Sequence, residues 1–161
     1  MTLTLFRATS LLLLLPTLAF AAIGEVTEHS GSGAVERDEG FEVYEVTDGL
    51  GVESMDTVVT EKGKVRIDFI DDTRVDITEH SRLIIDDFVY DPASQEGSLS
   101  LKAGLGTIRY ASGKIAKNSR QRVRIETPSA VVGVRGTDFA MIVDEIGGSM
   151  VNLLPSCDTN G

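Results

Sequence analysis

The chain has 161 residues, one cysteine and a formal net charge of −10, from 15 Lys and Arg against 25 Asp and Glu. This acidic balance, without a basic patch or a basic amphipathic segment, argues against nucleic acids and anionic membrane surfaces as partners. The length suits one domain of ordinary size, and a single cysteine excludes a disulfide within the chain.

The first 21 residues have the order of a secretory signal peptide. Arg7 supplies the positive region, residues 11–15 supply the leucine run, and Ala19-Phe20-Ala21 supplies the small residues before a cleavage site. We therefore expect cleavage after Ala21 and a periplasmic or extracellular protein, with no stable membrane insertion afterwards. The alternative is an uncleaved anchor, because residues 8–24 carry no charge and reach the short limit for spanning a bilayer.

Residues 22–40 are rich in Glu, Gly and Ser, which predicts a flexible N-terminal segment. From Phe41 onward the chain is predicted to form strands, because apolar and polar residues alternate with a period of two. The alternation is clearest at Val65, Ile67 and Phe69, and it returns at Val75 and Ile77, Leu83 and Ile85, Leu99 and Leu101, and Val123 and Ile125.

Each apolar run is expected to end in residues that favour turns or accept a positive φ. Residues 22–161 show no apolar residues at the spacing of a helix face. These turn residues are Asp71-Asp72, Asp91-Pro92, Gly97, Gly104, Gly106 and Ser112-Gly113. The fold is therefore predicted to be all-β, either an irregular β-solenoid or a β-sandwich of short strands. Arg120, Arg122 and Arg124 occupy alternate positions and are predicted to form one solvated strand face.

Residues 125–139, which read IETPSAVVGVRGTDF, are the most informative segment. Pro128 has no N–H for a ladder, so we expect it at a strand start or edge. Gly133 and Gly136 are expected to make a corner, after which Phe139 enters the next strand. Arg135 is predicted to point inward and brace this corner through carbonyls or Asp138, the alternative being a role in ligand recognition.

This segment resembles the signature of the FecR family, in which a Thr-Pro pair, a small apolar run, Gly-Val-Arg-Gly-Thr and an aromatic residue close the domain. The residues that match are Thr127, Pro128, Gly133, Arg135, Gly136, Thr137 and Phe139. Residues 58–81 are also similar to that family, so the resemblance spans residues 46–143. It implies a FecR-like β domain over residues 41–161, used for protein contacts in the periplasm.

The FecR family includes anti-sigma regulators of iron uptake, which join a cytoplasmic domain and a transmembrane helix to this module. Only Met1 to Phe6 precede the signal region here, so the resemblance is expected to extend to the periplasmic module alone. We therefore predict an exported, non-catalytic protein that binds a protein partner or forms a scaffold in the cell envelope. The sequence does not identify the partner.

Catalytic and metal-binding patterns are weak. His29 and His80 lack partners at ligand or catalytic spacing, and Gly104-Leu105-Gly106 lacks the third glycine of a dinucleotide site, so no catalytic residue, metal site or cofactor is predicted. The alternative function is calcium-dependent adhesion or glycan binding, because carboxylates are the ligands that calcium prefers. Its candidates are Asp68, Asp71, Asp72, Asp76, Asp86, Asp87 and Asp91, although their spacing fits no calcium-binding loop.

The C-terminal residues predict one more apolar strand, at residues 149–154, followed by a turn sequence with no second strand after it. Cys157 would be unpaired in an oxidising compartment. Two hypotheses follow: the chain is a truncated form of a longer protein with a second cysteine, or Cys157 forms a disulfide between two copies in a homodimer. The alternative is a free cysteine without a role.

Overall fold

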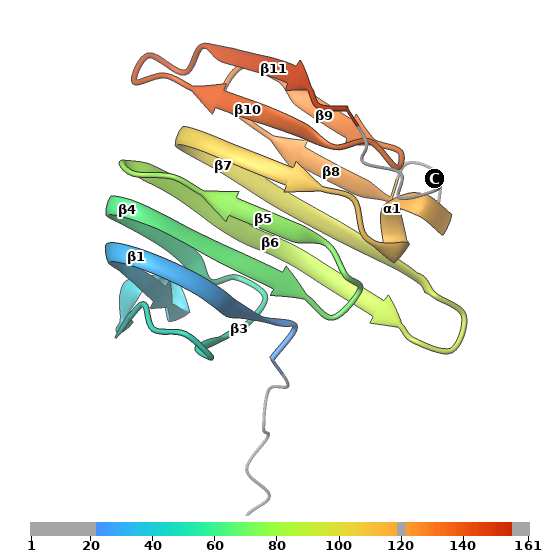
Figure 1. Ribbon diagram of the computed structural model, residues 1–161, viewed down its shortest axis with the longest axis horizontal. Helices are drawn as coiled ribbons and strands as arrows, with labels where there is room; N and C mark the ends of the chain where they lie inside the picture. Colours follow the sequence, from blue (N-terminus) through green and yellow to red (C-terminus); the bar gives the residue numbers. More distant parts are fainter. Residues whose placement is uncertain (1–21, 119–121, 156–161) are drawn as a thin grey trace, which may run out of the picture.

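A computed structural model describes residues 22–118 and 122–155. The expected signal peptide, Arg120 and Cys157 lie outside these ranges. The elements of the described residues are β1 (Gly24–Arg37), η1 (Asp38–Gly40), β2 (Glu42–Glu45), β3 (Gly51–Val52), β4 (Thr57–Phe69), β5 (Arg74–Ile77), β6 (Ser81–Asp91), β7 (Glu96–Ala111), α1 (Lys114–Asn118), β8 (Val123–Glu126), β9 (Val131–Val134), β10 (Phe139–Val143) and β11 (Ser149–Leu153). The fold is all-β, as predicted (Figure 1).

The strands form two layers, because β1, β4 and β7 are long enough to bend from one layer into the other. The first half of β4, residues 57–60, pairs with β6, and its second half, residues 65–68, pairs with β5. β7 likewise pairs with β6 and β8 before residue 106 and with β5 and β10 after it. One layer therefore has the order β11-β10-β7-β5-β4-β1-β3 and the other β9-β8-β7-β6-β4-β1-β2, which makes a β-sandwich.

Glycines occupy the line along which the long strands bend. Gly31 of β1 and Gly63 of β4 are cross-strand partners with φ values of 80° and 89°. A Cβ at either position would lie 2.0 Å from a carbonyl oxygen of the opposite strand. In β7, Gly106 has a φ of 90° and packs directly against Ser81. These positions need a residue without a side chain, because the backbones touch where the sheet folds over.

The core lies between the two layers and is built from the alternating apolar residues. Val65, Ile67 and Phe69 are buried, and the other pairs predicted from the alternation, Val75 and Ile77, Leu83 and Ile85, Leu99 and Leu101, and Val123 and Ile125, are buried with them. Two aromatic pairs add to it: Phe69 stacks on Phe88 at 5.5 Å, and Tyr110 stacks on Phe139 at 5.3 Å between ring centroids. The period-two prediction of the core is therefore confirmed.

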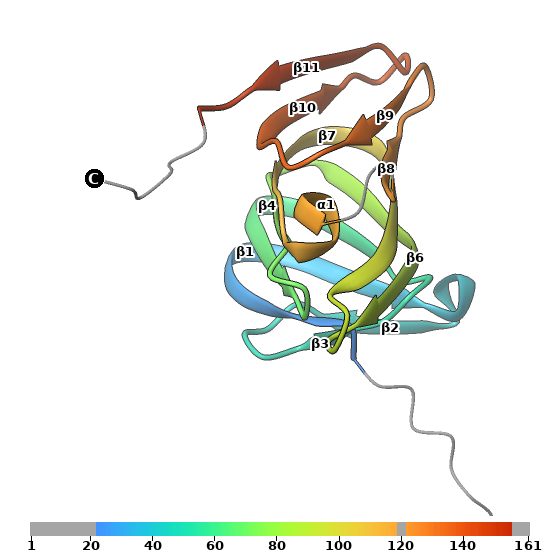
Figure 2. The ribbon, with the colours of Figure 1, turned by 90° about the vertical axis from the view of Figure 1, so that its right-hand side faces the viewer.

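The end of the sandwich opposite the glycine bends is covered by α1, which lies between the two walls of strands (Figure 2). Buried Asp71 holds this helix in place. Its carboxylate accepts hydrogen bonds from the N–H of Thr73 and of Ile115, and its carbonyl accepts one from the N–H of Lys114 at 2.7 Å. Asp71 is thus a structural residue that satisfies the free N–H groups at the start of α1.

The prediction of a flexible segment at residues 22–40 is wrong. These residues form β1, which pairs with β4 along most of its length and with β2 and β3. Val26 and Val35 are buried in the core, whereas Ser30, Gly31 and Ser32 lie at the bend. The Gly and Ser content that indicated disorder therefore serves the close approach of two strands.

The prediction that the strands are short and end at these glycines is also wrong for β7. Gly97, Gly104 and Gly106 lie inside β7 and do not end it; the strand has 16 residues. The register shift opposite Arg82 and Leu83 places a bulge at Gly104, so the glycines bend a continuous strand. The Asp71-Asp72 and Asp91-Pro92 turns are found as predicted, in the connections from β4 to β5 and from β6 to β7.

Candidate protein-binding surface

The turn between β8 and β9 contains Thr127 and Pro128. The N–H of Thr127 donates to the carbonyl of Ala130 at 2.8 Å, and the Thr127 hydroxyl accepts from the N–H of Ala130 at 3.0 Å. Pro128 therefore lies in a hairpin turn and not at the strand start or edge that was predicted, and in this turn its missing N–H costs no ladder bond. The hydroxyl of Ser149 donates to Thr127 Oγ1 at 2.7 Å, which joins this turn to β11.

The corner between β9 and β10 carries the rest of the sequence signature. Gly136 has a φ of 62°, whereas Gly133 lies within β9 with open space at its Cβ position, so one glycine makes the corner. The Asp138 carboxylate accepts a hydrogen bond from the N–H of Ser112 at 2.8 Å, and the Ser112 hydroxyl donates to the Thr137 carbonyl at 3.0 Å. These bonds fix the corner to the end of β7.

Arg135 does not point inward. Its side chain is exposed, and among the described residues it makes no ion pair with Asp138. The inward brace predicted for Arg135 is therefore wrong, and Asp138 holds the corner instead. The physical reason is that the free N–H of Ser112 needs an acceptor. A carboxylate supplies one, whereas a guanidinium has only donors.

We expect Arg135→Ala to change the free energy of unfolding by less than about 0.5 kcal/mol, because an exposed side chain away from the packed interior contributes little. Asp138→Ala should lower it by about 1–3 kcal/mol, because the Ser112 N–H loses its partner in a buried position. Urea unfolding of both variants measures this difference. A larger loss for Arg135→Ala than for Asp138→Ala would contradict it.

Among residues 22–118 and 122–155, the terminal strands of the two layers leave backbone groups without a ladder partner. At one end lies β2, whose four residues are all exposed and include Glu42 and Glu45. Asp38 and Glu39 precede it in η1. The N–H of Val46 donates to the Gly33 carbonyl of β1 at 3.0 Å. Because inward and outward residues alternate in an antiparallel ladder, the N–H and C=O groups of Val43 and Glu45 point away from β1. This edge is short and acidic, and both properties hinder strand addition.

At the other end of the sandwich lie β9, β10 and β11, which contain no charged residue. The predicted strand at residues 149–154 is confirmed as β11, the outermost strand of its layer (Figures 1 and 2). Val151 and Leu153 oppose the buried Met141 and Phe139 in the ladder, so they face the core side of the sheet. They are nevertheless 38% and 74% exposed, because β11 extends beyond the layer that would cover them.

With respect to the described residues, the backbone of β11 presents a regular free edge. The N–H of Leu154 donates to the Asp138 carbonyl at 2.9 Å, and that of Asp144 to the Gly148 carbonyl at 3.0 Å. In an antiparallel ladder this alternation turns the N–H and C=O groups of Ser149, Val151 and Leu153 away from β10. The edge carries no charge and no proline within β11, and it is therefore open to an added strand.

The sequence comparison agrees with this architecture. The family described as FecR protein matches residues 56–154, from the start of β4 to the end of β11. The chain is a member of the FecR family. Comparison with curated proteins and with solved structures gave no match. FecR proteins form a signalling and regulatory family of the cell envelope, and their domains are typically periplasmic. No helix in the described part of this FecR protein is long and apolar enough to cross a membrane.

The carboxylates that suggested calcium binding are distributed over this FecR domain and held by other groups. Arg66 binds both Asp76 and Glu28, at 2.6 and 2.5 Å, and Lys102 pairs with Asp86. Although partial burial acts to raise it, hydrogen bonds from Arg74 and Thr27 lower the pKa of Asp68. Within residues 22–118 and 122–155, no three His, Cys, Asp or Glu side chains are grouped to hold a metal ion.

The two histidines are surface residues in the part of the chain that the structure describes. His29 Nδ1 lies 2.6 Å from the Asp48 carboxylate in an exposed pair. His80 is exposed in the turn between β5 and β6, with a φ of 53°. Arg122 and Arg124, predicted as a solvated strand face, are both exposed and pair with Glu96 and Glu126.

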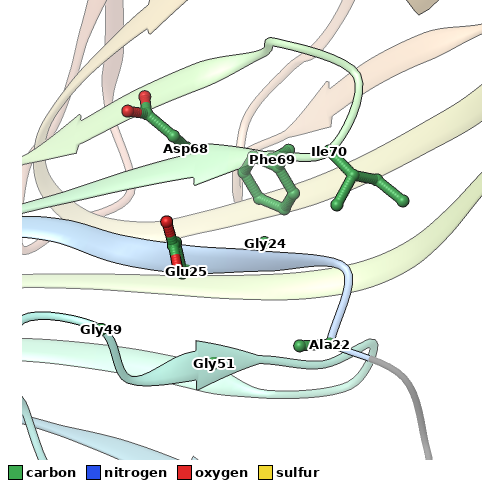
Figure 3. Close-up of a pocket in the computed structure, with 8 residues that line it drawn as sticks. All are labelled: Ala22, Gly24, Glu25, Gly49, Gly51, Asp68, Phe69 and Ile70. Carbon is green, nitrogen blue, oxygen red and sulfur yellow. The ribbon is translucent and has the colours of Figure 1, made fainter.

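A pocket of about 410 Å³ lies beside the N-terminal end of β1, with Glu25, Asp68 and Phe69 at its wall (Figure 3). Its other lining residues are Ala22, Gly24, Gly49, Gly51 and Ile70. Glu25 and Asp68 are cross-strand partners, but the Asp68 carboxylate already binds Arg74 at 2.6 Å. Among the described residues, the titratable side chains of the lining are Glu25 and Asp68 alone.

Proposed function

We propose that this FecR domain is exported, with cleavage after Ala21, and binds a protein partner in the cell envelope by strand addition to β11, without catalysis. The observation that carries the proposal is the free edge of β11. Three of its residues turn their N–H and C=O groups outward, and two of these, Val151 and Leu153, expose apolar side chains on the core side. An added strand would gain main-chain hydrogen bonds from the first property and side-chain contacts from the second.

The contrast between the two ends of the sandwich favours β11 over β2. β2 has four residues, two of them glutamates, and it follows the acidic η1 turn. β11 has five residues, none of which is charged. Proteins commonly protect a free edge with charges and short length, so the unprotected edge is the one expected to have a partner.

The test is a photo-reactive amino acid placed at Val151 in cells that export the protein. We expect a crosslinked protein partner at Val151 and none at Val43, the matched outward-facing position on β2. The exported protein purified from the same envelope fraction should begin at Ala22. The absence of any crosslink at Val151, or equal crosslinks at Val43, would contradict the assignment of this edge.

A further inference from the structure

We propose that the strand added to β11 is β11 of a second copy of this chain, related by a two-fold axis that passes between the two Val151 residues. This inference rests on the proposed function and names its partner. Antiparallel pairing about Val151 sets each Val151 opposite the other and sets Ser149 opposite Leu153 of the second copy. These are the three residues whose backbone groups face outward, so every outward N–H and C=O of β11 meets its counterpart.

The charges of the molecule favour a second copy at the β11 edge over the β2 edge. The chain carries a formal net charge of −10, so two copies repel one another wherever their acidic surfaces meet. At the β2 edge, a two-fold pairing would bring the strand that holds Glu42 and Glu45 beside the same acidic strand of the second copy. At the β11 edge no charged residue lies within the strand or within β10 beside it. The β11 edge therefore accepts its own copy without that cost.

The side chains of β11 also need the cover that a second copy supplies. Val151 and Leu153 face the core side of the layer but are not covered, and Met150 is exposed on the opposite side. β9 ends the other layer at the same end of the molecule (Figure 2), and its Val132 is only partly buried. A two-fold pairing places Val151 against Val151 and Leu153 beside the second copy's edge, which removes apolar surface from water.

The pairing is tested with the exported protein carrying Cys157→Ser, so that no disulfide contributes to the mass. Light scattering across a range of protein concentrations should give twice the mass of one chain. Val151→Pro should halve that mass, because it removes an outward N–H while leaving the ladder to β10 intact. Val43→Pro, which removes an outward N–H at the β2 edge, should keep the mass of the dimer.

A second variant covers the case in which the proline variant does not fold. Val151→Cys in the Cys157→Ser background should form a disulfide-linked dimer on mild oxidation, because residue 151 faces its own copy, whereas Val43→Cys should not. A single-chain mass at every concentration, or no disulfide at residue 151, would overturn the proposal. If Val151 then crosslinks a different protein in cells, the second copy is excluded and the proposed function stands; if it crosslinks nothing, both fail.

Discussion

Replacing Arg37 with alanine is expected to lower the free energy of unfolding by about 3–5 kcal/mol, because it leaves the buried Asp56 carboxylate without its counter-charge. The side chain of Asp56 has no exposed surface. Arg37 binds it through two hydrogen bonds of 2.8 Å, from Nε and Nη2, and pairs with Glu53 at 2.9 Å through Nη1. Such a two-point contact is among the strongest that side chains make.

The same contact ties three segments together. The hydrogen bond to Asp56 raises the pKa of Arg37. Arg37 ends β1, whereas Asp56 lies just before β4 and accepts the N–H of Glu53 at 2.8 Å. The Asp56 carbonyl also accepts the N–H of Ile85 in β6 at 2.9 Å. Loss of Arg37 therefore disturbs the junction at which β1, β4 and β6 meet.

Urea unfolding followed by circular dichroism measures the loss. The matched control is Arg74→Ala, which breaks the exposed pair with Asp68 and should cost about 0–1 kcal/mol. A double variant, Arg37→Met with Asp56→Leu, should be more stable than Arg37→Ala alone, because it removes the uncompensated charge. Equal losses for Arg37→Ala and Arg74→Ala would show that Asp56 does not depend on Arg37.

The alternation of apolar residues was enough to predict the core, because each strand has one face toward it. Val65, Ile67 and Phe69 could be assigned from their alternate positions in the sequence. The choice between a sandwich and a solenoid could not be made. It depends on where β1, β4 and β7 bend, and a glycine that bends a strand looks in sequence like a glycine that ends one.

Polar contacts between residues far apart in the sequence could not be predicted either. Arg37 and Asp56 are 19 residues apart, and no spacing rule connects them. The corner between β9 and β10 could be predicted in part, because the sequence pattern placed both Arg135 and Asp138 there. An aspartate that follows a turn often accepts a backbone N–H, and that signal would have favoured Asp138.

Gly31→Ala is expected to lower the free energy of unfolding by more than about 4 kcal/mol, which places it among the most damaging substitutions. Two effects add at this position. A φ of 80° costs a residue with a Cβ about 1–2 kcal/mol. The new Cβ would also lie 2.0 Å from the carbonyl oxygen of Lys62, which is backbone and cannot turn aside. β1 and β4 would have to separate at the bend that joins the two layers.

Two other glycines separate these effects. Gly40→Ala has a φ of 91° in open space, so it should lose only the backbone term of about 1–2 kcal/mol. Gly133→Ala, within β9 and also in open space, should leave stability unchanged or raise it by about 0.5 kcal/mol, because alanine loses less backbone entropy on folding. Thermal unfolding of the three variants ranks them, with soluble yield as the measure if Gly31→Ala does not fold. A Gly31→Ala protein as stable as Gly40→Ala would mean that the two strands can move apart at the bend, and that close backbone contact is not what holds the sandwich together there.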